Sequence, residues 1–82
     1  MQVLYFAWLR ERVGAASEEI DPNGAETARE LVEQLIASDP RYAAAFADMT
    51  AVRVAVDQEL CDLDAPISRA REIAFFPPVT GG

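Results

Sequence analysis

The chain ends in a segment whose residue types suit a covalent reaction at the terminus itself. Residues 75–82 read Phe-Phe-Pro-Pro-Val-Thr-Gly-Gly, and Gly82 is the last residue of the sequence. A C-terminal carboxylate has a pKa of roughly 3.3 to 3.7, so near neutral pH it is ionised and resists nucleophiles. Joining it to AMP makes a mixed anhydride with a good leaving group, which a sulfur donor can convert to a thiocarboxylate. We therefore expect the Gly82 carboxylate to be the reactive group.

The residues before this terminus suit an arm that enters a narrow channel in another protein. The arm consists of Pro77, Pro78, Val79, Thr80, Gly81 and Gly82. Six extended residues at roughly 3.3 Å each span about 20 Å. The two prolines favour an extended polyproline geometry at the base, and the two glycines have no Cβ to collide with channel walls. We expect residues 77–82 to form a flexible, extended C-terminal tail and residues 1–76 to form the folded domain.

Two phenylalanines precede the arm. Consecutive residues of a strand point to opposite faces, so if Phe75 lies in the core, Phe76 is exposed and available to anchor a partner. Equally, both rings could be covered within the fold. The sequence leaves these two interpretations open.

Composition excludes several other kinds of function. Fourteen acidic residues against seven basic ones give a net charge of −7, which disfavours nucleic acid and anionic membranes as partners. All seven basic residues are Arg, and without Lys or His the chain lacks the usual nucleophilic amine and general base. Cys61 is the sole cysteine, in an acidic run, and we assign it no chemical role and predict no metal site.

Length and hydropathy indicate one small domain in the cytoplasm. Eighty-two residues, about half of them apolar, are enough for a single core. No apolar stretch approaches the roughly 20 residues that span a bilayer. The first residues lack the basic region and cleavage site of a secretory signal.

The first half of the chain predicts two strands around a helical turn. Residues 3–7 are apolar and uncharged, which favours a central strand with both faces covered. Leu9 and Val13 lie four apart in a short helical turn that Gly14 can cap. Residues 17–20 then return as a second strand, before the turn signal at residues 21–24.

The clearest element is a helix that follows this turn. Its apolar face is formed by Ala28, Leu31, Val32, Leu35 and Ile36. Thr27 and Glu30 have capping-box spacing, so each side chain is predicted to bond the backbone amide of the other. Asp39 and Pro40 suit the start of a second, short helix to residue 47, with Tyr42 and Phe46 on one face.

The second half predicts three strands. Residues 52–56 alternate, with three valines directed to the core and Arg53 to solvent. Asp57 and Gln58 close a hairpin onto residues 59–62, of uncertain turn type because glycine is absent. Residues 72–76 form the last strand, which Pro77 ends. A mixed sheet packed on one main helix, with the first and last strands paired, is an α+β arrangement.

These residues resemble a known family, the small, sulfur-carrying subunits of molybdopterin synthase, which are ubiquitin-like β-grasp proteins. The residues that carry the resemblance are the terminal octapeptide 75–82, residues 3–7, residues 9–11 and residues 54–58. The octapeptide is highly specific, and the other segments are individually weak.

The resemblance implies that Gly82 is adenylated by an enzyme resembling the ubiquitin-activating type, which uses ATP, and then thiocarboxylated by a sulfur-delivery protein. It implies that the tail enters the large synthase subunit and donates sulfur to cyclic pyranopterin monophosphate to build the molybdopterin dithiolene. It also implies a heterotetramer of two small and two large subunits, with the catalytic residues on the large subunit and no cofactor permanently bound to the small one.

The sequence departs from the family at Ala70 and Arg71, where a Gly-Asp turn is common before the last strand, and this puts the local turn geometry in doubt. Three rival interpretations remain. The chain could carry sulfur for thiazole, cysteine or tRNA thiolation, although those families generally lack the Phe-Phe-Pro-Pro-Val-Thr run. It could be a ubiquitin-like protein modifier, although it lacks the Arg of ubiquitin's own end. It could also be an acidic binding module with a frayed terminus.

Overall fold

The structure is a computed structural model of the chain and describes residues 1–78. Its elements, in chain order, are β1 (Gln2–Tyr5), α1 (Trp8–Val13), β2 (Ser17–Glu19), α2 (Ala28–Ser38), α3 (Pro40–Ala45), the 3-10 turn η1 (Met49–Ala51), β3 (Arg53–Val56), β4 (Glu59–Cys61) and β5 (Glu72–Phe76). Every predicted strand and helix is present, with ends that shift by one or two residues.

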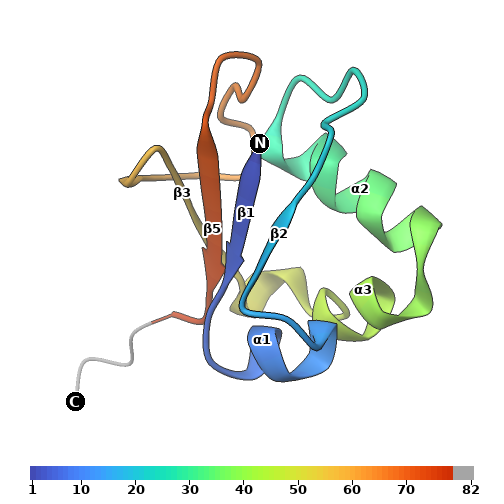
Figure 1. Ribbon diagram of the computed structural model, residues 1–82. Helices are drawn as coiled ribbons and strands as arrows, with labels where there is room; N and C mark the ends of the chain where they lie inside the picture. Colours follow the sequence, from blue (N-terminus) through green and yellow to red (C-terminus); the bar gives the residue numbers. More distant parts are fainter. Residues whose placement is uncertain (79–82) are drawn as a thin grey trace.

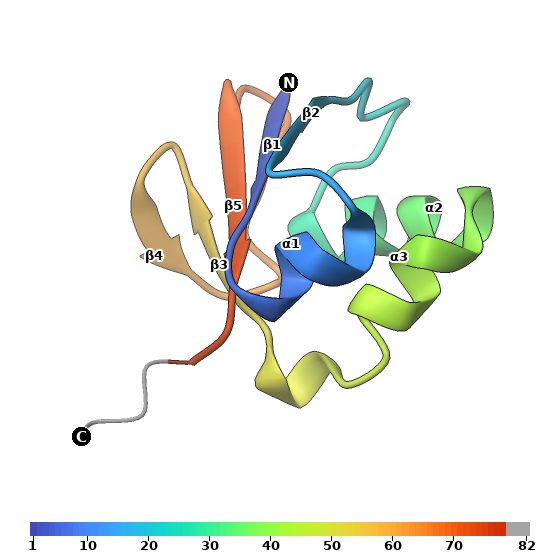
Figure 2. The same ribbon diagram turned by 60° about the horizontal axis from the view of Figure 1, so that its bottom comes forward.

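The strands form one mixed sheet in the order β2-β1-β5-β3-β4 (Figures 1 and 2; β4 is labelled in Figure 2). At its centre β1 and β5 run parallel, with Val3 opposite Ile73 and Tyr5 opposite Phe75, so the predicted pairing of the first and last strands is confirmed. The other neighbours are antiparallel. The middle of the sheet therefore consists of two segments from opposite ends of the chain.

The three α-helices lie on one side of this sheet (Figure 2). Residues buried between the layers include Val3, Tyr5, Leu9, Leu31, Tyr42, Phe46, Val54, Ile73 and Phe75. α2 contributes most of the predicted apolar face, but Ile36 lies at its margin and its side chain is 37% exposed. None of the helices described is long and apolar enough to cross a membrane.

The N-terminus of α2 is capped differently from the prediction. Thr27 accepts a hydrogen bond from the Glu30 amide at 3.2 Å, as expected. The Glu30 carboxylate, however, accepts from the amide of Glu26 at 2.8 Å and not from that of Thr27. The first amides of α2 also donate to the loop before β5, from Ala28 to Ala65 and from Arg29 to Leu63. That loop therefore helps to cap the N-terminus of α2.

β1 corrects the expectation for residues 3–7. The strand ends at Tyr5, because Ala7 adopts a positive φ and begins the turn into α1. Only one face is fully covered: Val3 and Tyr5 are buried, whereas Leu4 on the other face is half-buried. The absence of charge in residues 3–7 therefore does not mean that both faces of the strand are covered.

The two turns that the sequence left uncertain are now defined. Asp57 and Gln58 both have positive φ, as in a type I′ hairpin. The Asp57 carboxylate accepts hydrogen bonds from the amides of Arg71 and Glu72, at 2.9 and 3.0 Å. These bonds hold Asp57 in the left-handed conformation that glycine would otherwise favour. Ala70 and Arg71 have negative φ, so the chain makes the turn before β5 without the left-handed backbone that favours glycine.

One carboxylate joins the sheet to the helices. Glu18 on β2 accepts hydrogen bonds from the hydroxyls of Tyr42 at 2.6 Å and Tyr5 at 3.1 Å, and from Arg41 at 2.9 Å. Burial of the Tyr5 hydroxyl, and after it the charge of Glu18, raises the pKa of Tyr5. The hydroxyl therefore stays protonated and remains a donor. This cluster links β1, β2 and α3.

Replacing Glu18 should test the value of this cluster. Glu18→Ala leaves the buried Tyr5 hydroxyl without its acceptor, so we expect the free energy of unfolding to fall by about 2 kcal/mol in urea titrations. Glu18→Gln keeps an acceptor oxygen and should lose less. The neighbouring exposed change Ser17→Ala should stay within about 0.5 kcal/mol. Equal stability of Glu18→Ala and Ser17→Ala would show that the cluster contributes nothing.

Candidate functional site

The predicted arm begins where the central strand ends. β5 ends at Phe76, as predicted, and Pro77 and Pro78 follow it, both half-buried. Val79, Thr80, Gly81 and Gly82 lie outside the described residues, so the expected reactive carboxylate and the outer arm are not placed. What the structure defines is the platform from which they start.

Phe75 fixes this platform to the core. Its side chain is fully buried, and its ring lies 6.3 Å from that of Tyr5 and 5.0 Å from that of Phe46, the latter edge-on. Its carbonyl accepts a hydrogen bond from the amide of Phe6 at 3.1 Å. Pairing with β1 and β3 on either side holds the strand along its whole length. The base of the arm is therefore rigid.

Phe76 points to the opposite face of the sheet from Phe75. The burial pattern of β5 alternates, with Ile73 and Phe75 buried and Phe76 half-buried. Of the two interpretations, the structure supports the first in part: Phe76 is outside the core and yet not fully exposed. Its register partner on β3 is Arg53, whose side chain is exposed.

The face that Phe76 shares has an apolar centre, with Arg53 beside Phe76, and the helices do not cover it (Figure 2). Register places Leu4, Ala74, Ala55 and Leu60 in one row across four strands, because directly paired residues share a face. Leu60 is 73% exposed. Phe6, which extends β1 beside Phe75, is 48% exposed. We call this set the apolar face: Leu4, Phe6, Ala55, Leu60, Ala74 and Phe76.

Sequence reasoning missed Leu60 and Phe6, although a signal for Leu60 existed. A two-residue hairpin at Asp57 and Gln58 pairs Val56 with Glu59, so Leu60 must face away from the core valines. Cys61 faces the core instead, half-buried, with its sulfur 3.8 Å from the carbonyl oxygen of Val54. It packs against the core. Within residues 1–78 no cluster of His, Cys, Asp or Glu is arranged to hold a metal ion.

Ala7 is the strained residue of this region. Its φ of 54° and ψ of −132° fall where glycine is comfortable and a Cβ is not. The turn is held by hydrogen bonds from Leu9 to Phe6 and from Glu11 to Ala7. The strain therefore accompanies the sharp exit of the chain from β1, directly after Phe6.

This arrangement defines the class of the protein. A mixed five-stranded sheet with its first and last strands parallel at the centre, wrapped on one face around a main helix, is a ubiquitin-like β-grasp fold. The structure of SAMP1 from Haloferax volcanii is similar, with a TM-score of 0.76, 25% identity and coverage of 100% of this chain and 98% of that one. A putative molybdopterin converting factor subunit 1 from Pyrococcus furiosus gives a TM-score of 0.71 at 30% identity, covering 95% of each chain.

Sequence comparison narrows the class further. Residues 3–82 match the ThiS family. The molybdopterin synthase sulfur carrier subunit of Escherichia coli is 39% identical over 82 residues, which is 100% of this chain and 99% of the relative. The protein of the same name from Haemophilus influenzae is 37% identical with the same coverage. This chain therefore belongs to the ThiS family.

The strain at Ala7 can be measured directly. Ala7→Gly removes the Cβ that this conformation disfavours, and Ala7 makes no side-chain cap bond that glycine would lose. The relief of this strain, less the conformational-entropy cost of glycine, should raise the free energy of unfolding by about 1 kcal/mol. Ala43→Gly, at an exposed position of helix α3, should instead lower it by up to about 1 kcal/mol. Two equal losses would mean that Ala7 is not strained.

Proposed function

We propose that this chain is the sulfur carrier subunit of a molybdopterin synthase. The observation that carries the proposal is the full-length match to two proteins of that name, at 39% and 37% identity, in a chain whose own sequence ends in Gly-Gly. The family match by itself leaves the pathway open. The names of these relatives favour molybdopterin over thiazole, cysteine or tRNA thiolation.

In the proposed cycle the Gly82 carboxylate is a substrate and not a catalyst. A ubiquitin-activating-like adenylyltransferase joins it to AMP, and pyrophosphate leaves from ATP. A sulfur-delivery protein then supplies sulfur, AMP leaves, and a thiocarboxylate remains. Sulfur is a softer and better nucleophile than the carboxylate oxygen. No permanently bound cofactor is needed on the small subunit.

The thiocarboxylate then acts inside the large subunit. In this proposal the arm, residues 77–82, extends from the domain formed by residues 1–76 into a channel of the large subunit, and Gly81 and Gly82 enter the part that is too narrow for a side chain. There it donates sulfur to cyclic pyranopterin monophosphate, and two such deliveries complete the dithiolene. The large subunit supplies substrate binding and proton transfer in a heterotetramer of two small and two large subunits. The absence of Lys and His from this chain agrees with such a division.

The apolar face is the docking surface in this proposal, and its occupant is the large subunit. The face is continuous with the arm, because Phe76 belongs to the face and is followed directly by Pro77. A partner that receives the arm must therefore lie against this side of the sheet. Leu60, with 73% of its side chain exposed, gains most from being covered.

A protein-modifier role is the second candidate, and one observation favours it. SAMP1 of Haloferax volcanii, also described as small archaeal modifier protein 1, shares the fold with TM-scores of 0.76. A modifier would use the same adenylate but pass Gly82 to lysine side chains of other proteins. The absence of Lys here prevents chains linked through its own lysines but not a single attachment. Formation of stable isopeptide conjugates would support this role.

Activation of the terminus is the first test. After incubation with the adenylyltransferase, ATP and a sulfur donor, intact-mass analysis should show one oxygen replaced by sulfur. A variant with one alanine appended after Gly82 is the matched control and should keep the fold but gain no sulfur. An unchanged mass of the native chain with competent reagents would refute the carrier role, and sulfur on the extended variant would refute the terminal carboxylate as its site.

Docking is tested by two apolar surface residues on different sides of the molecule. Leu60→Ala should weaken binding to the large subunit at least about ten-fold in calorimetry, as truncation of a central anchor does. Ile36 is also exposed, but on helix α2, and Ile36→Ala should leave affinity unchanged. Both variants should remain folded because neither side chain is buried. Equal affinities for the two variants would remove the apolar face from the interface.

A further inference from the structure

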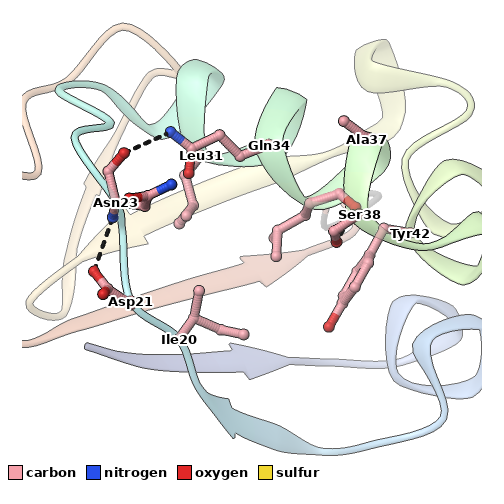
Figure 3. Close-up of a pocket in the computed structure, with 9 residues that line it drawn as sticks. Ile20, Asp21, Asn23, Leu31, Gln34, Ala37, Ser38 and Tyr42 are labelled. Carbon is pink, nitrogen blue, oxygen red and sulfur yellow. Dashed lines mark hydrogen bonds between the residues drawn. The ribbon is translucent and has the colours of Figure 1, made fainter.

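A groove lies on the helical side of the molecule, apart from the apolar face. It runs between the end of β2 with its following loop and helices α2 and α3, and has a volume of about 470 Å³. Figure 3 shows Ile20 and Leu31 pointing into this space from opposite walls, with the ring of Tyr42 at one end. Leu35 also lines it. Leu31 and Leu35 are buried at the floor of the groove, which has more than enough room for one aliphatic side chain.

The polar residues of the groove are largely occupied by local bonds. Asp21 accepts a hydrogen bond from the Asn23 amide at 2.9 Å, and Gln34 donates to the Asn23 carbonyl at 3.3 Å. The Ser38 hydroxyl donates to the Leu35 carbonyl at 2.7 Å. These bonds hold the loop against α2 and keep the groove open. They do not converge on a point, which argues against a small polar ligand.

The free edge of β2 lies beside the groove. Among residues 1–78, β2 is an outermost strand of the sheet and pairs only with β1. Tyr5 donates to the Ala16 carbonyl and Ile20 donates to the Met1 carbonyl, so these alternate residues face β1. By alternation the backbone groups of Ser17 and Glu19 face outward. Such an edge pairs readily with an extended segment of another chain.

Charge selects the kind of segment. Asp21 lines the groove. Glu19 lies on the adjacent edge with 74% of its side chain exposed, and its carboxylate is paired with the N-terminal ammonium of Met1 at 2.8 Å. The lining residues include no Arg. The nearest arginine on α3, Arg41, is engaged by Glu18 at 2.9 Å and by Asp39 at 3.7 Å. Asp21 is the one charged residue among those that line the groove, so a segment with Lys or Arg beside an aliphatic residue complements the groove and an acidic segment is repelled.

We propose that a basic, extended peptide segment of a partner protein adds to β2 as a further strand and places one aliphatic side chain in the groove. Ile20 lies beside Met1, at the start of β1, whereas Phe76 lies beyond Tyr5, at the other end of the parallel pair. A partner at the groove therefore leaves the arm and the apolar face free. The site is separate from the proposed sulfur transfer and does not depend on it.

The probe is a synthetic acetylated peptide, Lys-Val-Ile-Val-Lys, titrated into the isotopically labelled full chain and followed by amide NMR shifts. We expect saturable shifts at residues 17–21 and 31–38 and none at Leu60 or Ala74. The charge-reversed peptide Glu-Val-Ile-Val-Glu should not bind. Shifts confined to the apolar face, or equal binding of both peptides, would overturn the proposal. So would the same shifts on simple concentration of the chain, which would assign the groove to a second copy.

Variants separate the three parts of the proposed site. Ser17→Pro removes an outward amide and should abolish the shifts, whereas Ser17→Ala should retain them. Ala37→Trp fills the groove and should also abolish them, whereas Ala43→Trp on α3 should not. Asp21→Asn keeps the turn acceptor but removes the charge, and should weaken binding about two- to five-fold. Unchanged affinity in both Ser17→Pro and Ala37→Trp, each shown folded by its spectrum, would contradict the proposal.

Discussion

The parallel pairing of β1 with β5 is the constraint on which the rest of the molecule depends. It joins residues 2–5 to residues 72–76 and so needs the whole intervening chain as its crossover. That crossover supplies α2, which packs on the inner face of the pair, strand β2 on one side of the pair and the β3–β4 hairpin on the other. Because β5 is central, the residues that follow Phe76 leave from the most firmly held strand. A reactive terminus at the end of such an arm has a fixed origin.

Coverage of only one face divides the surface into regions with different character. The helices bury Phe75 and its neighbours, while Phe76, Leu60 and Phe6 remain on an apolar face next to the arm. At the far edge β2 is too short to cover α2 completely, and a groove remains there. The packing of the three helices on one side of the sheet accounts for both the apolar face and the groove. The Glu18 cluster holds the edge strand in place against α3.

Sequence patterns predicted the elements well where side chains report directly on burial. The period of α2, the alternation around Val54 and the proline stop after Phe76 all led to the observed elements. Patterns failed on the particular partners of polar groups. The Glu30 carboxylate accepts from the Glu26 amide, one residue before the predicted Thr27. Asp57 accepts from Arg71 and Glu72, which belong to a distant segment. The residue types around Ala7 do not predict its positive φ, which follows from the sharp turn of the chain from β1 into α1. The groove beside β2 likewise depends on how far two elements stand apart, which no local pattern encodes.

The candidate site divides in the same way. The reactive end and the arm remain predictions from residue types, because residues 79–82 lie outside the described part of the chain. The apolar face could be identified only from the register of four strands. The most direct measurement is reconstitution with the chain carrying a Gly82 thiocarboxylate, the large synthase subunit and cyclic pyranopterin monophosphate. Our proposal predicts molybdopterin, with two carriers returned to the carboxylate for each product. No molybdopterin, together with sulfur transfer only in a thiazole or tRNA assay or conjugation only to protein lysines, would contradict it.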